Sequence, residues 1–259
     1  MSASAYLQQF SLAGQVALVT GSARGLGACI ARALAGCGAH VLVNGRNEQA
    51  VRDAVDDMRA DGLAASALPF DVVDDAAVER AYARIDADFG RLDILVNNVG
   101  ARNRKPLHEM TAAEIRALID TDLVAGILLA KLAAERMARH RHGRLIAITS
   151  VAGELARAGD SVYPAAKQGL TGMVRALAME YGGLGITSNA IAPGTFATET
   201  NAAIVADPVM GAALAARNPM GRWGRPDEIA GAAVFLASAA ASYVNGHVLV
   251  VDGGLSVQF

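Results

Sequence analysis

Short apolar stretches alternate with longer amphipathic stretches along the whole chain. The apolar stretches are rich in β-branched residues, which predicts buried strands. We expect strands at 16–20, 40–44, 64–70, 92–97, 143–150, 186–191 and 248–251. The amphipathic stretches have helical periodicity and predict helices at 25–37, 47–61, 74–89, 111–140, 161–183 and 226–239.

This alternation predicts an α/β fold, a doubly wound parallel sheet of about seven strands with helices on both faces. No linker, repeat or low-complexity segment interrupts the pattern, so we expect a single domain over 1–259. The least regular segment, 193–225, is rich in proline and glycine. A long irregular segment after a late strand is a candidate substrate lid.

Composition narrows the class of protein. The chain has 259 residues, is 53% hydrophobic and 19% charged, and has a net charge of -2. These values favour a compact core or large subunit interfaces, and they argue against nucleic-acid binding. Met1–Phe10 lacks the pattern of a signal peptide, and no apolar run is suited to spanning a bilayer. We therefore expect a cytoplasmic protein with no membrane or nucleic-acid partner.

Three glycines follow the first predicted strand. Gly21 comes directly after that strand, and Gly25 and Gly27 stand at the start of the first predicted helix. A glycine turn at this place lets backbone N–H groups bind a phosphate at the helix N-terminus. The spacing differs from the commoner G-x-G-x-x-G. The alternative is an ordinary tight turn, but the flanking strand and helix favour a dinucleotide site.

Tyr163 and Lys167 are four residues apart, so a helix places them on one face. A nearby ammonium favours the phenolate form of a tyrosine, which can then act as general acid or base. Ser150 ends a predicted strand, and its hydroxyl could polarise a carbonyl oxygen. The trio fits carbonyl–alcohol interconversion with a hydride carrier. The alternative is a solvent-exposed helix face with no chemical role.

Together these features resemble the short-chain dehydrogenase/reductase family over nearly the whole chain. The resemblance rests on Thr20–Gly27, on Asn97–Gly100, on the Ser150, Tyr163 and Lys167 trio, on Pro193-Gly194 with Thr198, and on Asp252–Gly254. It implies a Rossmann-type fold and an NAD(P)-dependent oxidoreductase acting on CH–OH groups. Val99 departs mildly from the family motif, which has alanine there.

The family resemblance also implies roles for individual residues. Ser150 would bind the keto oxygen, Tyr163 would donate the proton, and Lys167 would assist Tyr163 and bind the nicotinamide ribose. No metal is implied. The remaining cofactor contacts would come from Gly21, Ser22, Arg24, Gly25, Leu26, Gly27, Asn44, Arg46, Asp71, Val72, Asn98, Val99, Gly100, Pro193, Gly194 and Thr198.

The end of the second predicted strand indicates the choice of cofactor. NAD-specific doubly wound enzymes usually carry a carboxylate there for the ribose 2′-hydroxyl. This chain has Asn44-Gly-Arg46 instead. Arg46 and Arg24 could pair with a 2′-phosphate, which favours NADP(H) over NAD(H). The alternative is that Arg46 is a solvated loop residue.

A narrower resemblance concerns the substrate. The stretches 43–47, 150–157, 196–200 and 221–226 resemble the sugar-acid dehydrogenases of the family, which implies interconversion of D-gluconate and 5-keto-D-gluconate. A sugar acid needs a cation for its carboxylate. Ligands of open sheets bind at the carboxyl ends of the strands. The candidates placed to meet the substrate are Arg102, Arg104 and Lys105 for the carboxylate, and Glu154 and Arg157 for sugar hydroxyls, each of which could equally be a surface charge.

Asp122 is the departure that matters most, because the family usually has asparagine there. In the family this asparagine helps to hold a water linked to the lysine. An ionised Asp122 cannot donate a hydrogen bond; it favours protonated Lys167 and opposes a Tyr163 phenolate. We expect activity with a shifted pH profile. The alternative is that Asp122 cripples turnover.

Other functions remain open on the same scaffold. The chain could reduce 3-oxoacyl groups on a carrier protein, or steroids and other bulky ketones. From another class, it could be a weakly catalytic NADP(H)-binding regulatory protein, although the intact trio argues against this. The family resemblance implies a homotetramer or a dimer.

Overall fold

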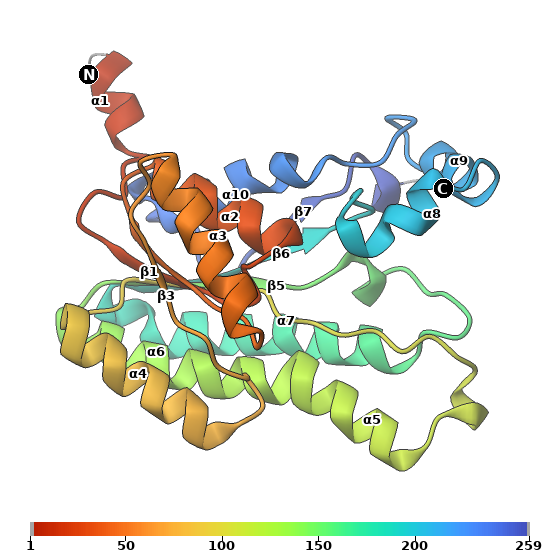
Figure 1. Ribbon diagram of the computed structural model, residues 1–259, viewed down its shortest axis with the longest axis horizontal. Coiled ribbons are helices and arrows are strands. Elements are labelled where there is room, and N and C mark those ends of the chain that lie inside the picture. Colours follow the sequence, from red (N-terminus) through yellow and green to blue (C-terminus); the bar gives the residue numbers. More distant parts are fainter. Residues whose placement is uncertain (1–2, 258–259) are drawn as a thin grey trace.

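The computed structural model describes residues 3–257 and contains one seven-stranded parallel sheet (Figure 1). The strand order is β3-β2-β1-β4-β5-β6-β7. The strands are β1 (Val16–Val19), β2 (His40–Val43), β3 (Ala65–Ala67), β4 (Ile94–Asn97), β5 (Gly143–Ile148), β6 (Ile186–Pro193) and β7 (Val248–Val251). The predicted fold class is confirmed.

Helices cover both faces of the sheet (Figure 1). One face carries α2 (Gly25–Gly36), α3 (Glu48–Ala60) and α10 (Ala230–Ala237). The other carries α4 (Asp75–Phe89), α5 (Ala112–Ile119), α6 (Ala125–His140) and α7 (Val162–Tyr181). The central strands are buried on both faces, which explains why they are apolar at consecutive positions and do not alternate with polar residues.

Two large apolar clusters hold these layers together. On the first face, Ile30 and Leu34 of α2 pack with Val41 and Ile94 from the sheet. On the second face, buried side chains of α4 and α6 pack with Leu18, Leu95 and Leu145. Alternate residues of each strand therefore serve opposite layers, as the two-residue period of a strand requires.

Two regions differ from the sequence prediction. The predicted helix over 111–140 is interrupted at Asp120–Val124, which form one π-helical turn between α5 and α6. Periodicity across the turn stays close to helical, so the sequence pattern does not reveal it. The segment 193–225, predicted as irregular, contains two short helices, α8 (Ala202–Ala206) and α9 (Met210–Ala216), and α1 (Ala3–Gln8) was also not predicted.

The strand order determines where a crevice for a ligand can form. The chain runs outward from β1 to β2 and β3, and then crosses to β4 on the other side of β1. At such a reversal the helices that follow β1 and β4 lie on opposite faces of the sheet, which leaves space for a ligand at its carboxyl edge. Among the helices described, none is both long and apolar enough to cross a membrane.

Candidate active site

The loops after β1 and β4 are joined at the carboxyl edge of the sheet. The side-chain amide of Asn98 donates to the carbonyl oxygens of Thr20 and Gly21, at 2.9 and 3.2 Å. The Thr20 hydroxyl accepts from the backbone N–H of Asn98 at 2.9 Å. The predicted glycine loop and the Asn97–Gly100 segment therefore form one continuous surface.

The glycine loop has the close packing that a phosphate cradle requires. Gly25 has a φ of +60°, which favours glycine. A Cβ at Gly27 would lie 2.5 Å from the carbonyl oxygen of Gly21. Helix α2 begins at Gly25, and Arg24 at its N-cap gives no side-chain hydrogen bond to the first turn. Those N–H groups remain available to a diphosphate, so the residues present fit a dinucleotide.

Ser22 and Asn44 are buried under this loop. Asn44 accepts from the N–H of Gly21 at 3.2 Å and donates to the carbonyl oxygens of Leu68 and Phe70. The Ser22 hydroxyl donates to the carbonyl oxygen of Val19 at 2.6 Å and accepts from the N–H of Asn44 at 3.0 Å. Both side chains therefore support the loop from beneath, and the backbone N–H of Ser22 donates to the carbonyl oxygen of Asn44 at 2.8 Å.

The charged residues predicted to bind the adenosine end lie at the rim. The Arg46 side chain is 80% exposed, and its Nη1 is 4.0 Å from a carboxylate oxygen of Asp71. Arg24 is also exposed. Val72 is buried, at 5% exposure, and Leu26 packs against the first apolar cluster. Arg46 is thus free to move toward a phosphate, because its contact with Asp71 is long and solvated.

Tyr163 and Lys167 lie together in the first turns of α7, where both are buried. Lys167 Nζ lies 5.7 Å from the centre of the Tyr163 ring and donates to the carbonyl oxygen of Ile148 at 3.1 Å. Ser150 follows the carboxyl end of β5, and its hydroxyl accepts from the N–H of Ala152 at 3.1 Å. The predicted one-face arrangement of the phenol and the ammonium is present.

Asp122 lies in the π-helical turn, with a side chain that is fully buried. Its Oδ1 is 3.6 Å from Lys167 Nζ and accepts from the N–H of Ala101 at 3.0 Å. Within residues 3–257 its Oδ2 has no hydrogen-bond partner. Burial raises the pKa of Asp122, and the charge of Lys167 acts in the opposite direction. A Cβ at Gly100 would lie 2.8 Å from Oδ1, so the contact requires glycine there.

The predicted substrate residues differ in what their side chains contact. The Arg102 guanidinium lies 4.2 Å above the centre of the Tyr163 ring. The Nε–H group of Arg104 donates a hydrogen bond to the buried carboxylate of Asp160 at 3.0 Å. Glu154 and Arg157 are exposed on the segment that follows Ser150. The role of Asp160 was not predicted, because its position before α7 shows no pattern that would pair it with Arg104.

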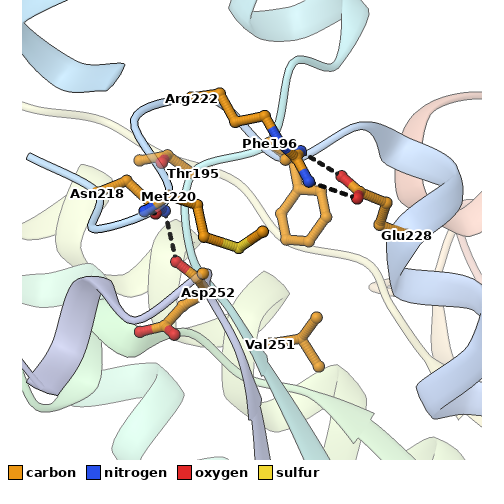
Figure 2. A pocket seen from close by; sticks show the side chains of 10 residues that line it. Thr195, Phe196, Asn218, Met220, Arg222, Glu228, Val251 and Asp252 are labelled. Atoms are coloured by element: carbon orange, nitrogen blue, oxygen red, sulfur yellow. Dashed lines mark hydrogen bonds and ion pairs between the residues drawn. The ribbon is translucent and has the colours of Figure 1, made fainter. Parts of the chain in front are cut away.

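Pro193 ends β6 and Gly194 follows it, and the candidate lid begins there. A Cβ at Gly194 would lie 2.6 Å from that of Asp252, so the two strand ends touch. Behind this junction is a cavity of 120 Å³ (Figure 2). Its lining includes Thr195, Phe196, Met220 and the Arg222–Glu228 ion pair, and it contains none of the catalytic trio.

Comparison with known proteins identifies relatives that match nearly the whole chain. A family profile described as enoyl-(acyl carrier protein) reductase matches residues 21–256. Gluconate 5-dehydrogenase of Gluconobacter oxydans is 43% identical over 96% of this chain and 97% of that protein. The 3-oxoacyl-[acyl-carrier-protein] reductase of Escherichia coli K12 is 40% identical over 93% of this chain and 97% of that protein. A crystal structure of a gluconate 5-dehydrogenase from Burkholderia cenocepacia, in complex with NADP and tartrate, has a TM-score of 0.94 and 40% identity, covering 98% of this chain and 100% of that one.

The doubly wound sheet, the glycine loop after β1 and the buried tyrosine–lysine pair next to Gly100 define a dinucleotide-dependent oxidoreductase. The matches extend over nearly the full length of the chain and of its relatives. The chain belongs to the short-chain dehydrogenase/reductase family. The resemblance stated from the sequence motifs is therefore confirmed.

Proposed function

We propose that the protein interconverts D-gluconate and 5-keto-D-gluconate with NADP(H). The observation that carries the proposal is the cationic loop after β4, with Arg102 directly over Tyr163. A cation at this place suits a substrate that carries a carboxylate in addition to its reacting carbonyl group. The similarity to gluconate 5-dehydrogenases, one of them crystallised with NADP and the dicarboxylate tartrate, supports the same substrate class.

NADPH supplies the hydride when it is bound. Ser150 then binds the keto oxygen of the substrate, and the hydroxyl of Tyr163 gives that oxygen a proton. Lys167 assists Tyr163 as a neighbouring cation and also binds the nicotinamide ribose. Asp122 acts beside Lys167 as its counter-charge. The burial of Lys167 and Asp122, and the position of Lys167 Nζ 3.6 Å from Asp122 Oδ1 and 5.7 Å from the centre of the Tyr163 ring, support the roles of these residues.

The glycine loop, the Asn98–Gly100 segment and the start of α2 hold the diphosphate and the nicotinamide half. Arg46 and Arg24 bind the 2′-phosphate, because both are exposed at the rim and no carboxylate ends β2. Asp71 and Val72 flank the adenine, and Thr198 meets the nicotinamide.

We also propose one domain over 1–259, with 193–225 as the substrate lid, in a cytoplasmic homotetramer or dimer. Exposed apolar side chains where the π-helical turn meets α6 support assembly, since Val124 and Ile127 are 38% and 44% exposed. Two free thiols, Cys29 and Cys37, fit a reducing compartment.

The test is oxidation of NADPH by the purified protein in the presence of 5-keto-D-gluconate, with NADH run in parallel. Turnover that is rapid with NADPH and slow with NADH supports the proposal. The second candidate function is reduction of carrier-bound 3-oxoacyl groups, which the 40% identical reductase of Escherichia coli favours. Turnover of an acetoacetyl thioester but not of the keto acid would replace the first function with the second.

A further inference from the structure

The first residues of the candidate lid lie against the glycine loop. A few residues after the end of β6 the chain reaches Thr198, which is followed by one 3₁₀ turn (Glu199–Asn201). A Cβ at Gly25 would lie 3.6 Å from Oε2 of Glu199 and 4.0 Å from Cγ2 of Thr198. The carboxylate of Glu199 is therefore close to the residue at which α2 begins, although the two are far apart in the sequence.

The charge of Glu199 is not balanced by a neighbouring cation. Glu199 is exposed, and among residues 3–257 no cationic side chain forms an ion pair with it. Arg225, for example, pairs with Asp227 and Glu228. The negative charge acts on α2, because burial raises the pKa of the Cys29 thiol in its second turn and the charges of Asp227 and Glu199 add to that rise.

The start of α2 attracts anions of either kind. The first N–H groups of a helix carry partial positive charge and have no partner within the helix. Arg24 at the N-cap offers them no side-chain acceptor. A carboxylate or a phosphate can therefore lie there, and the diphosphate of the cofactor binds at this glycine loop in the function proposed above. Two negative groups at one helix terminus repel each other, and salt weakens that repulsion.

We propose that Glu199 sets the affinity of the protein for NADP(H). Its carboxylate and the cofactor diphosphate compete for the start of α2, so the carboxylate weakens the binding of the oxidised and the reduced cofactor alike. Weaker binding favours exchange of the cofactor after each turnover. The inference rests on the cofactor part of the proposed function, and it holds whichever ketone the protein reduces.

The test is the dissociation constant of NADPH, measured by fluorescence titration of wild type and of Glu199→Gln. Glutamine keeps the length of the side chain and removes its charge. We expect the dissociation constant to fall about 3- to 10-fold at low ionic strength, the range for one charge at a helix terminus. In 1 M salt, where the screening length is about 3 Å, the two proteins should differ less than about 2-fold.

Two controls separate a local contact from a general effect of net charge. Adenosine 2′-phosphate carries the 2′-phosphate of the cofactor but no diphosphate, so its affinity, measured calorimetrically, should be the same in wild type and Glu199→Gln. Glu79→Gln is the matched variant, since it removes the same charge from an exposed position on α4, on the other face of the sheet. It should leave the affinity for NADPH unchanged. Melting temperatures show that both variants are folded.

The outcomes distinguish this proposal from the proposed function. NADPH affinity that is unchanged or weaker in Glu199→Gln would overturn the role of Glu199 and leave the cofactor site itself intact. An equal gain in affinity for adenosine 2′-phosphate, or an equal gain for NADPH in Glu79→Gln, would overturn it as well, because the effect would then come from net charge. Failure of wild type to bind NADPH would refute the cofactor site, and with it both the proposed function and this inference.

Discussion

Asp122→Asn tests the electrostatics of the catalytic pair. At the observed 3.6 Å between Lys167 Nζ and Asp122 Oδ1, two unit charges attract by about 5 kcal/mol at an effective dielectric constant of about 20. Burying two ions costs several kcal/mol for each, which offsets this attraction. The consequence of having aspartate here should therefore be found in proton equilibria.

The direction of the expected change in the pH profile follows from the negative charge of Asp122. In alcohol oxidation Tyr163 must accept a proton from the substrate, and a carboxylate nearby opposes the phenolate that accepts it. Replacing Asp122 by asparagine removes the opposing charge. We expect the rising limb of log kcat/KM for gluconate oxidation to move to lower pH by about one unit, which corresponds to about 1.4 kcal/mol.

The assay is kcat/KM for D-gluconate and NADP⁺ measured from acidic to alkaline pH in both proteins. Superimposable profiles, or a limb that moves to higher pH, would refute the reasoning. Thermal melting at a series of pH values gives an independent test, because it reports how Asp122 changes stability with pH. Burial raises the pKa of Asp122, so its contribution to stability is present below the ordinary carboxyl pKa and lost as pH rises through the raised value. Wild type should therefore lose stability relative to the asparagine variant over that rise.

Two further predictions concern the loops around the site. Hydrogen bonds from Lys105 and Thr111 lower the pKa of Glu114 to about 2. Its contribution to stability is therefore present above about pH 4.5 and lost as pH falls toward 2, so Glu114→Gln should lower the melting temperature at pH 7 and lose that difference in acid; a difference that persists at low pH would contradict this. Gly27→Ala would place a Cβ 2.5 Å from the carbonyl oxygen of Gly21, and we expect NADPH binding, measured by fluorescence titration, to weaken at least tenfold; unaltered affinity would show that the loop relaxes.

Much of the site was predictable because its signals are local. Tyr163 and Lys167 are joined by helical spacing, and the three glycines stand where a strand leads into a helix. Apolar runs identified all seven strands, with differences at their ends, because a strand buried on both faces requires consecutive apolar residues. The departure at Asp122 was also visible, since its neighbours match the family pattern.

Tertiary structure alone decided how the charged residues divide their roles. Sequence spacing treats Arg102, Arg104 and Lys105 as equivalent cations after one strand. The fold brings Asp160 from 56 positions away to Arg104, and Glu114 to Lys105, leaving Arg102 over Tyr163. The sequence likewise indicates only that Asn44 ends a strand near the cofactor, whereas the fold places its side chain beneath the glycine loop. Helical and strand periods are properties of one segment, whereas pairing between distant side chains depends on which loops the sheet order places together.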